Sequence, residues 1–168
     1  SNPAFQAETP HLGAVIATEL AGSGPMPPFL SLNQAGTMQG STFLGGSAAP
    51  LAAPTEGRGL SVIQHDYFGS DSEQRFAERY SLLERLDARL RTAPLDQTMA
   101  DHTAHYASAR QMMFNESIAS VFRLSDQENA RYGDTSLGRA ARVARNAIQA
   151  GNGSVFIGLT HSGWDTHQ

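Results

Sequence analysis

The chain has 168 residues, 40% of them hydrophobic, and a formal net charge of −4. This composition suffices for one domain with a buried core, and the negative charge gives no reason to expect nucleic acid as a partner. Cysteine and lysine are absent, which excludes disulfides, thiolate catalysis and a lysine Schiff base within this chain, and no apolar run is long enough to span a membrane.

Residues 1–33 predict a helix followed by a strand. The helix is expected to begin near Pro10, because proline favours the first turn, and to end before the glycine-rich segment 22–25. Residues 29–33 form a short apolar run that predicts a strand. We expect this strand in the same sheet as a second apolar run at 154–160.

Residues 34–71 form a loop region rich in Gly, Ala, Ser and Pro. Its glycines have neither the Walker nor the Rossmann spacing. We expect an ordered surface loop anchored by Phe43, Leu44 and Leu51, rather than a flexible linker. Residues 60–63 predict a further short extended segment.

Residues 72–123 predict a hairpin of two long amphipathic helices. The first helix is expected to run to about Thr92, before Pro94, and the second from Asp96 to Arg123. The apolar positions expected to face inward are Phe76, Tyr80, Leu83, Leu86 and Leu90 in the first helix, and Met99, Tyr106, Met113, Ile118, Val121 and Phe122 in the second.

Residues 134–168 predict a third helix, a turn, the strand at 154–160 and a polar loop. The helix is expected over 137–150, with Gly151 at the position after its end, where glycine is favoured. Its inward positions are expected to be Leu137, Ala141, Ala144 and Ile148.

The polar loop at 161–167 is the strongest candidate for a functional site, because sites in open α/β sheets form beyond the carboxyl ends of strands. Asp165 and His167 are residue types that bind Zn, Mn or Ca. They are two positions apart, so a turn is needed for their side chains to converge. The other interpretation is structural, with Asp165 capping a following helix and Trp164 anchoring the core.

The remaining histidines give weaker signals. His102 and His105 share a helix face, but without a His-Glu-x-x-His motif they are better interpreted as solvated. His65 beside Asp66 is more typical of a loop turn than of a catalytic pair. His11 is expected to be structural or to cap the first helix, although its position on a loop leaves it free to face a site. The Gly-x-Ser-x-Gly motif of a serine hydrolase is absent from the sequence.

Several segments, taken in order, resemble the bacterial domain of unknown function 1501 family. The segments are 10–14, 27–32, 43–45, 131–133, 137–139 and 163–167. The most specific of them is Gly-Trp-Asp-Thr-His at 163–167, which follows a hydrophobic strand. The resemblance extends over nearly the whole chain.

The resemblance implies a sulfatase-like protein of the alkaline phosphatase superfamily. The expected fold is part of an α/β/α sandwich, helix-rich, with a few short strands and a long helical hairpin. Enzymes of that superfamily carry a di-metal site at strand ends and transfer phosphoryl or sulfuryl groups. The likeness makes Asp165 and His167 candidate ligands of a divalent metal (Zn, Mn or Ca), and His161 a contact to those ligands or to the substrate.

The resemblance also implies export by the twin-arginine route to the periplasm or cell envelope, and a small phosphate or sulfate ester as substrate. The nucleophile and the other metal ligands of the superfamily would lie before Ser1 and after Gln168. We therefore expect residues 1–168 to be one partial domain that is inactive alone. The alternative is an exported, non-catalytic binding or assembly protein with the same fold, and the oligomeric state stays open.

Overall fold

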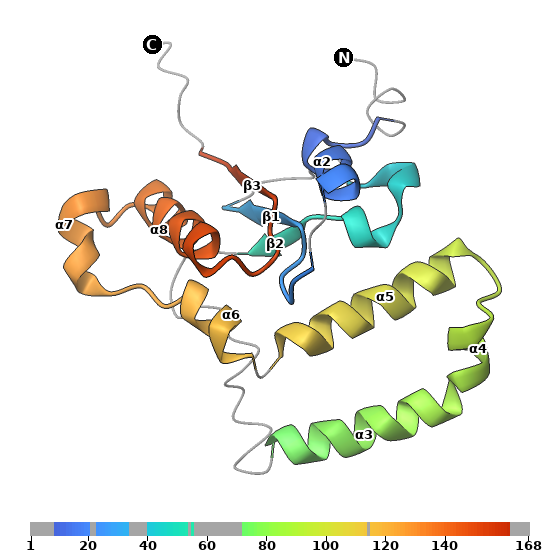
Figure 1. The fold of residues 1–168 in the computed structure, drawn as a ribbon. Helices are drawn as coiled ribbons and strands as arrows, with labels where there is room; N and C mark the ends of the chain where they lie inside the picture. The colour runs from blue at the N-terminus through green and yellow to red at the C-terminus, as the bar shows by residue number, and fades with distance from the viewer. Residues whose placement is uncertain are drawn as a thin grey trace, which may run out of the picture.

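The computed structural model describes residues 9–20, 23–33, 40–53, 55, 72–113 and 115–161. These residues form a three-stranded parallel sheet with helices on both faces, and a helical hairpin that projects away from the sheet (Figure 1). The predicted helix-rich α/β class is therefore confirmed. None of the helices in these ranges is long and apolar enough to cross a membrane.

The sheet has the strand order β2-β1-β3, and both neighbouring pairs are parallel. β1 (Phe29–Leu32) lies in the centre, between β2 (Leu51–Ala53) and β3 (Phe156–Leu159). The pairing of residues 29–32 with residues 156–159 confirms that the two apolar runs share a sheet. β2 lies within the region predicted to be a loop. Its three residues form a strand by pairing with β1, which local sequence does not indicate.

One face of the sheet is covered by α2 (Leu12–Leu20) and the short helix η2 (Gly46–Ala48). Ala14 and Ala17 of α2 are buried in one cluster with Phe29 of β1. Small side chains on α2 allow the helix to lie close to the aromatic residue. Phe29 packs on this face of the sheet, and Leu30, the next residue of β1, packs on the opposite face.

The loop region before β2 is only partly as predicted. Besides η2 it contains η1 (Thr42–Leu44), so it is ordered over these residues. Leu44 packs against the cluster beneath α2, but Phe43 is 77% exposed and is not an anchor. The predicted extended segment 60–63 lies outside the described residues.

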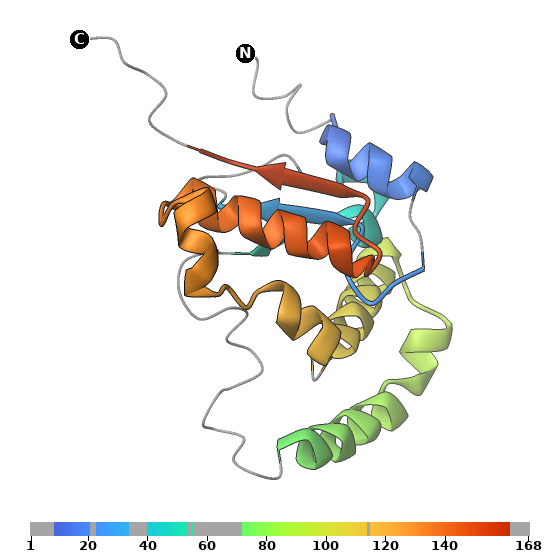
Figure 2. The ribbon, with the colours of Figure 1, turned by 60° about the vertical axis from the view of Figure 1, so that its left-hand side comes forward.

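The opposite face of the sheet is covered by α6 (Glu116–Val121) and α8 (Ser136–Ala150), and Figure 2 shows α8 running alongside the strands. Leu30 and Leu32 of β1 are fully buried there. The buried cluster on this face consists of Met26, Leu30, Leu32, Ala53, Ile118, Val121, Phe122, Ala140, Val143, Ala144 and Ala147. It is the larger of the two cores, so most of the packing that fixes the sheet lies on this side.

α8 begins and ends as predicted, and Ala144 faces the core as expected, but the rest of the inward face differs from the prediction. Gly151 has a φ of 61°, the left-handed conformation that ends a helix and favours glycine. Ile148, predicted to point inward, is 71% exposed, whereas Ala147 is buried. The buried stripe consists mainly of alanines, which let the helix axis approach the sheet more closely than leucine or isoleucine would.

The outer side of α8 is covered by η5 (Asp126–Glu128) and α7 (Asn129–Tyr132). Arg142 of α8 is 2% exposed, and its Nη1 donates a hydrogen bond to the backbone oxygen of Ser125 at 3.0 Å. Arg145 forms an ion pair with Glu128. These arginines fasten α8 to the segment that precedes it.

The hairpin contains α3 (Ser72–Leu86), α4 (Ala88–Thr92) and α5 (Gln97–Met112). The prediction of two uninterrupted helices is wrong in both arms. The first arm breaks at Asp87, between α3 and α4. The second arm ends at Met112, because the side chain of Asn115 accepts hydrogen bonds from the backbone of Ser117 and Ile118 and starts α6 instead.

The apolar stripe predicted to face inward in the first arm does so only in part, because Tyr80 is buried as predicted but the leucines of the stripe are exposed. Leu86 is 74% exposed and Leu83 is 37% exposed. Tyr80 is buried because the guanidinium groups of Arg91 and Arg110 lie over its ring, at 5.4 and 4.5 Å from its centre. Periodicity identified an amphipathic helix, but it does not specify what covers the apolar side.

Candidate functional site

All three strands end at the same edge of the sheet. Leu32 of β1 pairs with Ala53 of β2 on one side and with Leu159 of β3 on the other. The backbone N–H of Thr160 donates to the oxygen of Leu32 at 3.1 Å, so the chain stays hydrogen-bonded to the end of β1 as it leaves β3. This carboxyl edge is the place where sites form in parallel sheets.

Asn33 joins the ends of two strands to the start of α8. It follows β1 with a φ of 56°, a left-handed conformation that asparagine tolerates better than most residues. Its Nδ2 donates to the backbone oxygen of Ser136 at 2.6 Å. Its Oδ1 accepts from the backbone N–H of Thr55 at 3.3 Å and from the hydroxyl of Thr55. We call Asn33, Thr55 and Ser136 the edge network.

The edge network is largely shielded from water. Thr55 is 4% exposed, and its hydroxyl also lies 3.5 Å from the oxygen of Ser136. A buried polar group is stabilised mainly by having its hydrogen bonds made. The network therefore fixes the position of the strand ends on which side chains of a site would be mounted.

The amino terminus of α8 lies at this same edge, because Ser136 is its first residue. Thr135 caps the helix, with its hydroxyl accepting from the backbone N–H of Gly138 at 3.0 Å. The positive end of the helix dipole thus lies beside the carboxyl edge, and an anion there is favoured electrostatically. Arg139, in the first turns, is paired with Asp134 at 2.7 Å.

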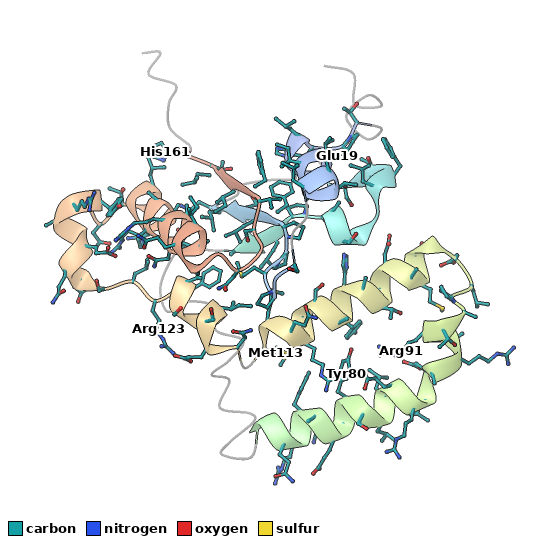
Figure 3. All side chains as sticks on the ribbon, in the orientation of Figure 1. Glu19, Tyr80, Arg91, Met113, Arg123 and His161 are labelled. Atoms are coloured by element: carbon teal, nitrogen blue, oxygen red, sulfur yellow. The ribbon has the colours of Figure 1, made fainter. Side chains whose placement is uncertain are left out.

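His161 is at the carboxyl edge, as predicted. It lies two residues beyond the end of β3 and its side chain is exposed. Figure 3 shows it at the end of the described chain, at the periphery of the molecule and on the opposite side from the hairpin residues Tyr80 and Arg91. An imidazole in this place is accessible to a ligand from solvent.

Asp165 and His167, the two predicted metal ligands, lie outside the described residues, so their assignment stays a prediction. Within the described ranges no group of three or more His, Cys, Asp or Glu side chains is arranged to hold a metal ion. The oxygens of the edge network are already engaged in hydrogen bonds. The described residues therefore do not form a metal site by themselves.

The other predicted histidines have structural contacts. Nδ1 of His11 accepts from the backbone N–H of Gly13 at 2.9 Å, so the prediction that His11 caps the first helix is confirmed. His105 is not merely solvated, since its Nε2 lies 2.8 Å from the oxygen of Gly46 and donates to it. His102 is exposed beside Tyr106, and the pair of His65 and Asp66 lies outside the described residues.

One exposed ion pair lies beside α6 and not at the carboxyl edge. The hydrogen bond from Arg123 to Glu116, together with the negative charge of that carboxylate, raises the pKa of the Arg123 guanidinium. An arginine is already protonated throughout the physiological range. This pair consequently gives the protein no pH dependence near neutrality.

The edge network was not predicted from the sequence. Asn33 and Ser136 are 103 positions apart, and Asn33 and Thr55 are 22 apart. A signal was present at Asn33 alone, because an asparagine directly after a buried strand is typical of a left-handed turn. Nothing local to Thr55 or Ser136 indicates that they would meet it.

Comparison with known proteins settles the family. A family model described as "Protein of unknown function (DUF1501)" matches residues 3–168. The chain belongs to this family. The resemblance carried by the sequence segments is therefore confirmed, and the DUF1501 match includes the edge network, His161 and the residues that follow it. No curated protein and no solved structure matches this DUF1501 chain.

Proposed function

We propose that this DUF1501 protein is an exported, metal-dependent hydrolase of phosphate or sulfate esters, and that the carboxyl edge of the sheet is part of its active site. One observation carries the proposal. Three parallel strands end together at an edge stiffened by buried hydrogen bonds, and Asp165 and His167 follow the last strand within eight residues of the sequence. The resemblance to sulfatase-like proteins supplies the reaction class.

The roles of the residues follow from their chemistry. Asp165 and His167 would bind a divalent cation (Zn, Mn or Ca), which polarises the ester oxygens when it is bound. His161 would contact those ligands or the substrate. Asn33 and Thr55 would act only by position, since their polar atoms bind each other and the start of α8.

Electrostatics at the edge support an anionic substrate. The amino terminus of α8 carries a partial positive charge of roughly half an elementary unit, and this charge favours phosphate or sulfate groups nearby. The helix has no acidic residue in its first turn that would offset this charge. Location in the periplasm or cell envelope, after twin-arginine export, belongs to the same proposal.

Ester hydrolysis tests the proposal on the complete gene product. p-Nitrophenyl phosphate and p-nitrophenyl sulfate would be assayed with Zn, Mn or Ca added, and again after treatment with EDTA. Asp165→Asn and His167→Ala should each lower kcat/KM by about 100-fold or more, as expected when a metal ligand is lost. The matched controls are Asp126→Asn and His102→Ala, two exposed side chains away from the edge, which should leave the rate unchanged.

A second function, that of a non-catalytic binding or assembly protein, is favoured by the hairpin. The leucines and tyrosine that the hairpin exposes are Leu82, Leu83, Leu86, Leu90, Leu95 and Tyr106. Three of them, Leu83, Leu90 and Tyr106, line one hollow together, and exposed apolar patches of this kind are typical of interaction surfaces. Sedimentation velocity of Leu86→Glu, with Ile148→Glu on α8 as control, distinguishes assembly from catalysis: assembly predicts a change in the first variant only, with no ester hydrolysis in the wild type.

A further inference from the structure

A pocket lies at the edge of the sheet opposite to the proposed active site. Its volume is about 510 Å³, within the range of roughly 300–1,000 Å³ typical of small-molecule sites. One wall comes from the residues that precede β1 and β2, and the other comes from α5. Both views place the segment before β1 beside the last turns of α5 (Figures 1 and 2).

The sheet-side wall is rigid. It contains Pro25, Pro27, Pro28 and Pro50, whose rings fix the φ angle of the backbone. The carbonyl oxygens of Pro27 and Pro28 are bound by residues 154–156, with distances of 2.8 to 3.0 Å. A wall of this kind loses little conformational entropy when a ligand binds, which favours affinity.

The α5 wall is held at a fixed distance by a contact at one end of the pocket. Nε2 of His105 donates to the oxygen of Gly46 at 2.8 Å. A Cβ atom on Gly46 would lie 2.6 Å from this nitrogen, so only glycine permits the approach. Further along α5, Ser108 and Gln111 line the pocket, and neither side chain has a hydrogen-bond partner among the described residues.

Among the described residues that line the pocket, none is Asp, Glu or Arg. Its apolar part includes Met26, Leu44, Leu51 and Met112 besides the prolines. Transfer of an ion from water to such surroundings is strongly unfavourable without a charged partner. A hydroxyl and an amide on α5 instead offer neutral donors and acceptors.

We propose that this pocket binds a neutral, mostly apolar small molecule whose polar group is recognised by Ser108 and Gln111. The ligand lies between the sheet and the hairpin and contacts both. The site is separate from the carboxyl edge, and its ligand is uncharged, unlike the anionic phosphate and sulfate esters proposed there. Its occupancy holds α5 against the body of the domain.

Binding of N-phenyl-1-naphthylamine by equilibrium dialysis tests the proposal on the whole chain. This probe is neutral and aromatic with one N–H group, and its sulfonated analogue, 1-anilinonaphthalene-8-sulfonate, has the same ring system with a negative charge. The wild type should bind the neutral probe saturably. Ala109→Trp, which places an indole in the pocket, should weaken binding at least tenfold, whereas Ala107→Trp on the same helix should have no effect, since residue 107 does not line the pocket.

Two further measurements test whether the pocket recognises a polar group through Gln111 and whether it disfavours a charged ligand. Gln111→Met keeps the length of the side chain and removes its amide, and should weaken binding of the neutral probe by about 2–10-fold. The sulfonated analogue should bind at least tenfold more weakly at the site that Ala109→Trp abolishes. The proposal is overturned by absence of saturable binding, by equal affinities of the two tryptophan variants, or by preference of the site for the sulfonate.

Discussion

Replacement of Asn33 by alanine should destabilise the protein by about 2–4 kcal/mol, because the edge network depends on this side chain. The amide of Asn33 donates to Ser136 at 2.6 Å and accepts from the backbone and hydroxyl of Thr55. Each such bond contributes about 0.5–1.5 kcal/mol net, and a buried partner left without a hydrogen bond adds about 1–3 kcal/mol.

Backbone strain at this position is separable from the loss of hydrogen bonds. Asn33 has a φ of 56°, which disfavours alanine by about 1–2 kcal/mol. Asn33→Gly removes the same hydrogen bonds without that strain, although glycine raises the entropy of the unfolded chain by an equivalent of about 0.4–1 kcal/mol. Both variants should therefore lose at least about 2 kcal/mol relative to the wild type.

Urea unfolding followed by far-ultraviolet circular dichroism gives the free energies. Thr55→Val should lose about 1 kcal/mol, and its combination with Asn33→Ala should be non-additive, since the two residues share hydrogen bonds. A loss below about 0.5 kcal/mol in both Asn33 variants, which is usual for surface substitutions, would refute the role of the network. A near-normal Asn33→Gly beside a damaged Asn33→Ala would assign the effect to strain.

Two further predictions use the same unfolding assay. Gly138→Ala should lower the free energy of unfolding by about 1–3 kcal/mol although alanine favours helices, because its Cβ would overlap the carbonyl oxygens of residues 132–133. The control is Gly40→Ala, whose Cβ meets nothing within 4 Å and which should be nearly neutral. Equal losses in the two variants would contradict the packing described. Ile118→Ala, at a fully buried position, should lower the free energy of unfolding by about 2–5 kcal/mol, whereas Ile148→Ala, at a position 71% exposed, should lower it by less than about 0.5 kcal/mol. A larger loss at Ile148 than at Ile118 would support the inward position predicted for Ile148.

The parts of the fold that could be predicted are those with local signals. The helix over 136–150 carries a capping threonine before it and a glycine after it, and both have the expected conformations. The apolar runs that become β1 and β3 are short and bounded by turn residues, so each is recognisable alone. We could predict that β1 and β3 lie in one sheet because both are short apolar runs.

The parts that could not be predicted depend on contacts between distant residues. Leu51–Ala53 has no strand pattern of its own and becomes β2 by pairing with β1. The helix expected to run to Arg123 ends early, since Asn115 satisfies two backbone groups that a continuous helix would use otherwise. The face that α8 presents to the sheet is determined by close packing of its alanines and not by its largest apolar side chains.

The candidate site divides in the same way. His161 could be placed at the carboxyl edge because it directly follows a recognisable strand. Thr55 and Ser136 gave no signal, because each acquires its role from Asn33 through the folded chain. Asp165 and His167 remain predictions from residue type, position in the sequence and family resemblance.

The metal content of the complete gene product tests the central claim most directly. Wild-type protein would be compared with Asp165→Asn and His167→Ala by mass spectrometry of bound metal after incubation with Zn, Mn and Ca and removal of the excess. A metal–protein ratio near one or above in the wild type, reduced in both variants, is the result we predict. A wild-type protein without metal under all three conditions, or variants that retain the full content, would contradict a metal site at the carboxyl edge.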